Sequence, residues 1–154
     1  MKITVLHPVN KIPPTKRFES NGEEIKVTAY PKIFDWKWNI ISLENIHDYH
    51  HLNLHGFIII RGAPNAKAQL NKGSVVNRDS DNFTDQGCDW LMIDVDKYET
   101  SCDRDGVNFF IENELSKEFH GVACSVQFSS SAGILVNNQA IKSGLNCHLM
   151  FALD

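Results

Sequence analysis

The stretch Trp90-Leu91-Met92-Ile93-Asp94-Val95-Asp96 constrains the chain most, because it is typical of a buried β-strand that carries two carboxylates. Side chains alternate faces along a strand, so we expect Asp94 and Asp96 to share one face while Ile93 and Val95 point into a core. Neighbouring carboxylates in an apolar strand repel each other and lose solvation. A divalent cation between them would offset that cost, and the alternative is a strand end whose acids reach solvent or a nearby Lys.

Length and composition indicate one globular domain with a real core. The chain has 154 residues, and its apolar content of 42% and charged content of 22% are ordinary for that class. No apolar run is long enough to cross a membrane, and Met1–Leu6 lacks the features of a signal peptide. The four cysteines form no C-x-x-C pair and are typical of reduced thiols: Cys88, Cys102, Cys124 and Cys147. We therefore expect a cytoplasmic protein without a membrane partner.

Charge is unevenly distributed along the chain. Residues 1–78 carry 11 Lys and Arg against 6 Asp and Glu, a net charge of +5, whereas residues 79–154 carry 4 against 13, a net charge of −9. A basic half suits a polyanion and an acidic half suits cations, although chance clustering on a solvated surface gives the same pattern. The total of −4 gives no support for tight nucleic-acid binding by this chain alone.

Hydrophobic periodicity predicts a mixture of strands and helices. Strands are expected at residues 2–6, 24–30, 33–41, 57–60, 90–96, 122–128 and 147–153. Helices are expected at 43–52, after Ser42, and at 106–119. Residues 65–89 are expected to form a loop or a pair of short helical turns.

The segment 90–128 is predicted to be a strand–helix–strand unit, which places two strands parallel in one sheet. Asp103 or Asp105 suits the start of its helix, and Gly121 suits its end.

Two further patterns are candidates for ligand binding. Ser129-Ser130-Ser131-Ala132-Gly133 follows a predicted strand, and hydroxyls and backbone N–H groups in such a turn can hold phosphate oxygens. His47 and His51 lie one turn apart on a predicted helix and could share a metal, although the absence of an accompanying Glu or Cys pattern favours ordinary surface or packing histidines.

The last predicted strand adds a third acid. His148, Met150, Ala152 and Asp154 share one face if that strand is regular. Carboxylates that converge from neighbouring strands suit a site for phosphoryl transfer with two Mg²⁺ or Mn²⁺ ions. The predicted metal ligands are therefore Asp94, Asp96 and Asp154, and the predicted phosphate contacts include His148, Lys142 and the serines.

Residues 74–154 resemble the phage- and plasmid-type primase-polymerases of the archaeo-eukaryotic primase superfamily. Met92-Ile93-Asp94-Val95-Asp96 is similar to the h-h-D-h-D/E strand of that family, in which h is an apolar residue. The Ser129–Gly133 turn and the later strand from His148 to Asp154 are also similar, as are Arg78 before the first motif and Trp90 at its start. Asn146 stands where the family has a small residue, and the family domain normally continues beyond the position of Asp154.

The resemblance implies an α/β (α+β) fold, with a small N-terminal α/β module (1–73) and a sheet of RNA-recognition-motif type (74–154). It implies one catalytic domain over 1–154, truncated at its C-terminus. The implied function is DNA primase or polymerase in phage or plasmid replication, which forms a primer from NTPs or dNTPs on single-stranded DNA, with a helicase as a possible further partner.

The same resemblance implies roles for individual residues. Asp94, Asp96, Asp154 and His148 would be catalytic. The nucleotide contacts would be Ser129, Ser130, Ser131, Gly133, His148, Lys142 and Arg78. Arg61 and Arg78 would face the template or the nucleotide.

Two alternatives stay open. A replication-initiator nuclease of the His-x-His type needs a second metal-binding histidine on the strand, and His148-Leu149-Met150 lacks it. A non-catalytic nucleotide- or nucleic-acid-binding fragment remains compatible with the sequence.

Overall fold

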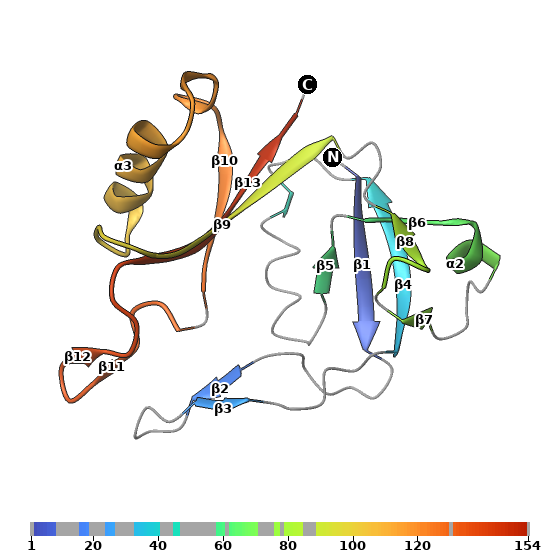
Figure 1. Ribbon diagram of the computed structural model, residues 1–154, viewed down its shortest axis with the longest axis horizontal. Helices are drawn as coiled ribbons and strands as arrows, with labels where there is room; N and C mark the ends of the chain where they lie inside the picture. Colours follow the sequence, from blue (N-terminus) through green and yellow to red (C-terminus); the bar gives the residue numbers. More distant parts are fainter. Residues whose placement is uncertain are drawn as a thin grey trace. The chain divides into compact units, whose positions relative to one another are not determined.

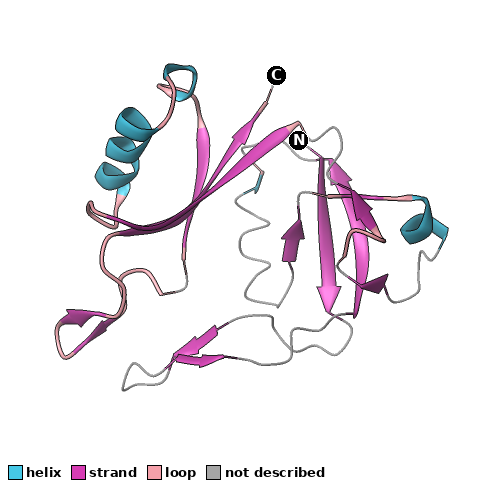
Figure 2. Cartoon of the chain, viewed as in Figure 1, coloured by secondary structure: helices cyan, strands magenta, loops and turns pink. Residues whose placement is uncertain are grey.

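A computed structural model describes residues 2–8, 16–18, 24–26, 33–40, 45–46, 58–60, 62–70, 76–77, 79–84, 89–129 and 131–153. Figures 1 and 2 show its elements along the chain. The chain divides into two compact units. The first comprises Met1–Lys16, Lys26–Leu91 and Ala152–Asp154, and the second comprises Arg17–Ile25 and Met92–Phe151. The described part is a mixed α+β structure of small, mostly antiparallel sheets and few helices.

The first unit is built around a four-stranded sheet in the order β5-β1-β4-β7. Its strands are β1 (Lys2–Pro8), β4 (Ile33–Ile40), β5 (Ile58–Ile60) and β7 (Val76–Asn77). β1 pairs antiparallel with both β4 and β5, and β4 pairs antiparallel with β7. The side chains of residues 3–6 are buried, because β1 is an inner strand of this sheet.

Short elements complete the first unit. They are β6 (Ala63–Pro64), α2 (Ala66–Leu70) and β8 (Phe83–Thr84), and β6 pairs antiparallel with β8. Leu6, Ala68 and Phe83 form a small buried cluster. The hydroxyl of Thr4, itself buried, donates to the carbonyl of Gly62 at 2.7 Å, which satisfies a polar group inside this unit.

The second unit is organised by a three-stranded sheet in the order β10-β13-β9. The strands are β9 (Trp90–Tyr98), β10 (Cys124–Phe128) and β13 (Leu145–Ala152), and β10 and β13 are antiparallel. β9 also runs antiparallel to β13, since the N–H of Leu153 donates to the Asp89 carbonyl at one end while Lys97 meets Asn146 near the other. β9 and β10 therefore run in the same direction, but β13 lies between them.

The helix α3 (Arg104–Glu114) covers one face of this sheet (Figure 1). Its buried Val107 and Ile111 pack with Val95 of β9 and with alternate residues of β13. The buried members of this core are Val95, Val107, Ile111, Leu145, Cys147, Leu149 and Phe151. The apolar residues recur with period 2 along the strands and with the helical period along α3, so each element turns one apolar side to the other.

Asp103, one of the two residues predicted to begin this helix, is the N-cap of α3. The Asp103 carboxylate accepts from the Gly106 N–H at 2.9 Å and from the Ser101 hydroxyl at 2.6 Å. Both hydrogen bonds favour the charged carboxylate, and the one from Ser101 has the larger effect. They hold the pKa of Asp103 below its usual value. The cap satisfies a donor that the first helical turn would otherwise leave without a partner.

The predicted helix over 106–119 differs from the observed one at both ends. α3 ends at Glu114 because Leu115 takes an extended backbone, and a 3₁₀ turn, η2 (Lys117–Phe119), follows. Phe119 still packs on the core, with its ring 5.0 Å from that of Phe151. Apolar residues that pack on the core therefore continue at helical spacing beyond Glu114, where α3 ends. Gly121, with a φ of 73°, follows η2 rather than α3.

Other predictions are confirmed in part. The strand predicted over 24–30 is described as β3 (Glu24–Lys26), which pairs with β2 (Lys16–Phe18). The segment 65–89, expected to be a loop or a pair of short helical turns, contains the short helix α2 and the strands β7 and β8, whose few residues each give no periodic signal. Only residues 45 and 46 of the helix predicted over 43–52 are described, so that helix lies largely outside the described residues. Among the described residues, no helix has the length and apolar character needed to span a membrane.

Candidate functional site

The open face of the β10-β13-β9 sheet, opposite α3, carries the two aspartates of the opening motif. Asp94 and Asp96 share this face, while Ile93 and Val95 pack on the α3 side, as predicted from strand alternation. The side chains of Asp94 and Asp96 are 69% and 57% exposed, so both carboxylates keep much of their hydration. The acids are accessible to a ligand from solvent.

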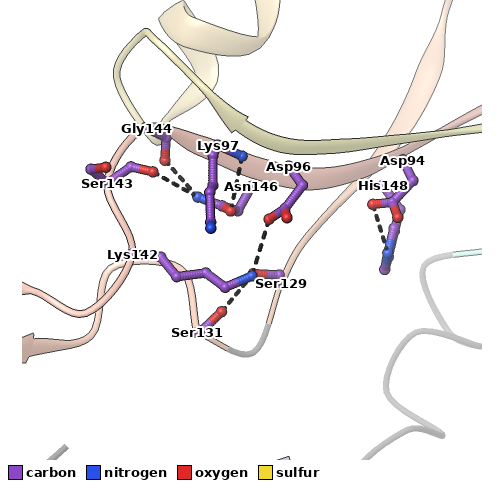
Figure 3. A network of polar contacts seen from close by, with 10 residues as sticks. All are labelled: Asp94, Asp96, Lys97, Ser129, Ser131, Lys142, Ser143, Gly144, Asn146 and His148. Carbon is purple, nitrogen blue, oxygen red and sulfur yellow. Dashed lines mark hydrogen bonds and ion pairs between the residues drawn. The ribbon is translucent and has the colours of Figure 1, made fainter.

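His148 lies beside Asp94 on the adjacent strand. Its Nε2 is 3.4 Å from Asp94 Oδ1, a pairing that carries opposite charges only when the imidazole is protonated (Figure 3). In the register with β10, His148 lies opposite Gln127, so one row across the sheet holds Asp94, His148 and Gln127. The structure thus brings together the predicted acid and the predicted histidine.

Lys142 pairs with the other aspartate. Its Nζ lies 3.0 Å from Asp96 Oδ1, and its side chain is only 23% exposed (Figure 3). Lys142 follows a hairpin of β11 (Leu135–Val136) and β12 (Gln139–Ala140), which the N–H of Ile141 closes by donating to the Ile134 carbonyl at 3.0 Å. The hairpin therefore delivers an ammonium group to the open face of a sheet to which it does not itself belong.

The buried amide of Asn146 links the segments that bear these two partners. Its Oδ1 accepts from the Lys97 N–H at 3.1 Å, and its Nδ2 donates to the carbonyls of Ser143 and Gly144 at 3.2 and 2.9 Å. Asn146 is 1% exposed, so these three hydrogen bonds replace the water that its amide loses on burial. Lys97 directly follows Asp96, and Ser143 directly follows Lys142.

The backbone around this amide is unusual on both sides. Lys97 has a φ of 58°, and the alternation of β9 shifts there, so that Tyr98 rather than Lys97 packs on the core and contacts Phe110 edge to face. Gly144 has a φ of 74°, and a Cβ there would lie 2.4 Å from the Tyr98 carbonyl oxygen. Only glycine allows this close approach between the two segments.

The serine turn begins on the same face. The N–H of Ser129 donates to the Asn146 carbonyl at 2.9 Å, and the Ser129 and Ser131 hydroxyls lie 3.2 Å apart. Ser131 is buried, and Ala132 donates its N–H back to the Ser129 carbonyl, which closes the turn. Gly133 is exposed and has a φ of 72°. Two of the three predicted serines are thereby tied to the strand that bears His148, and Ser130 lies outside the described residues.

The thiol of Cys147, next to His148 in the sequence, is unsuited to act as a nucleophile because its pKa is raised. Cys147 points away from the open face, into the core. Burial, and secondarily the nearby Cys102, Cys124 and Asp94, raises the pKa of the Cys147 thiol to about 11. It therefore stays protonated at neutral pH, and the reactive form of a cysteine is the thiolate.

Space for a ligand adjoins the acids. An open cavity of about 640 Å³ is lined by residues 94–98 of β9, by Glu99 after it and by Phe110 of α3. That volume falls in the range of small-molecule sites. Its lining includes both aspartates.

Several predicted site residues lie outside the described residues: Arg61, Arg78, Ser130, Asp154, His47 and His51. Within the described ranges, no three or more His, Cys, Asp or Glu side chains are grouped so as to hold a metal ion. The described part of the site thus contains two acids, with the third acid still a prediction.

Sequence reasoning missed the role of Asn146, and it allowed for a lysine beside the acids without identifying it as Lys142. The sequence led us to expect a phosphate contact for Lys142, and it marked Asn146 only as a departure from a family pattern. The separations of 49 and 46 residues between the partners leave no local signal. The one available hint was an Asn two residues before a histidine inside an apolar strand, since a buried amide needs hydrogen-bond partners.

Comparison with protein-family models, with curated proteins and with solved structures gives no match to this chain.

Proposed function

We propose that this chain carries the metal- and nucleotide-binding part of a primase-polymerase, which forms a DNA primer in phage or plasmid replication. The observation that carries the proposal is the row of Asp94 and His148 beside the Asp96–Lys142 pair on one accessible sheet face. Acids, a histidine and a lysine together suit a ligand that combines divalent cations with phosphates.

The strand order supports the finer description of the fold. In a split βαβ arrangement a later strand is inserted between the two strands that a helix connects. β13 lies in this way between β9 and β10, with α3 on one face. A sheet of RNA-recognition-motif type requires the same order of its first three strands, so we propose that fold for the second unit.

The donor chemistry suits Mg²⁺ or Mn²⁺. Both ions take carboxylate oxygens, and Asp94 and Asp96 offer exposed oxygens on one face. Asp96 already lies next to a positively charged group, since its Oδ1 is 3.0 Å from the Lys142 ammonium nitrogen. In our proposal Asp94 and Asp96 hold the ions, with Asp154 as the third carboxylate. When bound, such ions neutralise phosphate charge and favour deprotonation of a hydroxyl.

In the proposed reaction the 3′-hydroxyl of a primer or initiating nucleotide attacks the α-phosphorus of an NTP or dNTP. The new P–O bond forms as the bond to the β-phosphate bridging oxygen breaks, so pyrophosphate leaves and the hydroxyl proton is lost to solvent. His148, Lys142, Ser129 and Ser131 bind and orient the triphosphate. The DNA template and a helicase remain proposed partners.

A non-catalytic nucleotide-binding module is the second candidate. Its support is that Asp94 and Asp96 offer two exposed carboxylates on one face of the sheet. Two carboxylates suffice to bind one metal–nucleotide complex, because Mg²⁺ is commonly held by one or two carboxylates together with substrate phosphates.

The test replaces both acids with their neutral isosteres, Asp94→Asn together with Asp96→Asn. We expect Mn²⁺ affinity, measured by calorimetry, and Mn²⁺-dependent nucleotide binding to fall on the order of 100-fold. A matched control, Asp105→Asn with Glu112→Gln, removes the same charge from exposed positions of α3 and should leave both affinities unchanged. Undiminished binding in the Asp94/Asp96 variant would contradict the proposal.

A second measurement separates the two candidates. The chain is incubated with single-stranded DNA, labelled nucleotides and Mn²⁺. A labelled product that the Asp94/Asp96 variant does not form supports the polymerase. Metal-dependent nucleotide binding without product supports the binding module.

A further inference from the structure

The side chain of Asn146 joins the end of β9, next to Asp96, to the connection between β12 and β13 that carries Lys142 (Figure 3). One of its hydrogen bonds fixes the backbone of Lys97, the residue after Asp96. The other two fix the carbonyls of Ser143 and Gly144, directly after Lys142. A single buried amide therefore restrains both partners of the ion pair from the chain positions next to them.

We infer that Asn146 is a positioning residue, which sets Asp96 and Lys142 at the distance at which the carboxylate and the ammonium meet. As a statement about metal and nucleotide binding, the inference rests on the proposed function. The hydrogen bonds of Asn146 go to the neighbouring backbone, so it acts on the pair through the backbone on each side.

The local backbone explains why a positioning residue is needed at this point of the sheet. Lys97 occupies the left-handed region, which a non-glycine residue adopts at a cost unless its surroundings fix it. The hydrogen bond from the Lys97 N–H to Asn146 provides that restraint. Gly144 approaches the Tyr98 carbonyl so closely that the Lys142 segment rests directly on the end of β9. Loss of the Asn146 amide would free both segments at once.

Alanine at this position removes all three hydrogen bonds and leaves a small cavity. Asn146→Asp is almost the same size and keeps the acceptor for the Lys97 N–H, but sets a carboxylate against the carbonyls of Ser143 and Gly144. The two variants therefore differ in volume yet both release the Lys142 segment. Using both keeps the test valid if the alanine variant does not fold.

The first measurement needs no metal. Lysine acetylation rates are followed residue by residue by mass spectrometry, with the exposed Lys117 as internal reference. We expect Lys142 to react about two- to fivefold faster in both Asn146 variants, the range for loss of a part-exposed ion pair. Asp96→Asn, which neutralises the partner, gives the upper limit of this increase.

Val107→Ala is the control for destabilisation alone, because Val107 of α3 is buried in the core on the opposite face of the sheet from the pair. It should leave the rate of Lys142 unchanged. An unchanged Lys142 rate in both Asn146 variants, or an equal rise in Val107→Ala, would overturn the positioning role.

The second measurement is Mn²⁺ affinity on the same variants. We expect about a tenfold loss for Asn146→Ala, typical of groups that orient metal ligands, and none for Val107→Ala. If the unmodified chain binds Mn²⁺ and both Asn146 variants bind it equally well, the inference fails while the proposed function stands. If the unmodified chain binds no Mn²⁺, the proposed function fails, and the acetylation rates alone support or overturn the positioning of Lys142 by Asn146.

Discussion

The two faces of the β10-β13-β9 sheet are made from alternate residues of the same strands but differ in how far their side chains are buried. On the α3 face, Val95, Leu149 and Phe151 are almost fully buried. On the open face, Asp94 and Asp96 remain more than half exposed, and their partners come from neighbouring segments. The open face also has buried members, among them Met150 and Asn146, but its two acids are held by polar contacts at partly exposed positions. Substitution of the exposed acids is therefore expected to cost less stability than substitution in the core under α3.

The largest expected effect tests this division directly. Leu149→Ala removes a fully buried side chain from the α3 face, and we expect the free energy of unfolding to fall by about 2–5 kcal/mol. Asp94→Asn, on the open face, should change it by no more than about 0.5 kcal/mol. Urea unfolding followed by circular dichroism measures both. Similar losses in the two variants would show that the open face also holds the fold together.

The core thiol gives an intermediate effect on reactivity. Because the pKa of Cys147 is raised to about 11, its thiolate fraction at pH 8 should be on the order of 100-fold below that of an ordinary thiol. Alkylation by iodoacetamide, quantified by mass spectrometry, should accordingly be slow in the native chain and fast in urea. The native rate should rise with pH until about pH 11. Equal rates in the native and unfolded chain would place Cys147 on an accessible surface.

The smallest effect is expected from the ion pair of the open face. Lys142→Met should lower the free energy of unfolding by less than about 1 kcal/mol, since one partner is more than half exposed. In about 1 M salt the difference should shrink further, because the screening length falls to roughly 3 Å. Urea titrations at low and high salt provide the comparison. A salt-independent loss as large as that of Leu149→Ala would assign Lys142 to the core.

Local patterns in the sequence predicted the elements that depend on neighbouring residues. The alternation of Ile93, Asp94, Val95 and Asp96 was enough to assign each side chain to a face, because strand periodicity is local. The cap at Asp103 was predictable for the same reason. The direction of β9 and β10 was also predicted correctly, but the insertion of β13 between them was not.

What the sequence did not reveal depends on turn chemistry or on distant contacts. The β11–β12 hairpin turns through Asn137 and Asn138, whose φ values are 51° and 61°. A two-residue hairpin turn of this kind needs a positive φ at both central positions, and here two asparagines provide it without glycine. Its strands of two residues each leave no periodic pattern. The Asn146 hydrogen bonds and the Lys142 pairing join segments that are far apart in the sequence, so only the folded chain brings them together.

The position of β13 between β9 and β10 has a consequence for biosynthesis. β13 is the last of the three strands to leave the ribosome, yet it supplies the neighbour with which each of the others pairs. Until residues 145–152 have been made, β9 and β10 have no partner within this sheet, and the apolar side of α3 has only part of its core. Contacts of such sequence separation slow folding and expose unpaired strands to aggregation. We therefore expect nascent chains that stop before β13 to be sensitive to proteases and dependent on chaperones.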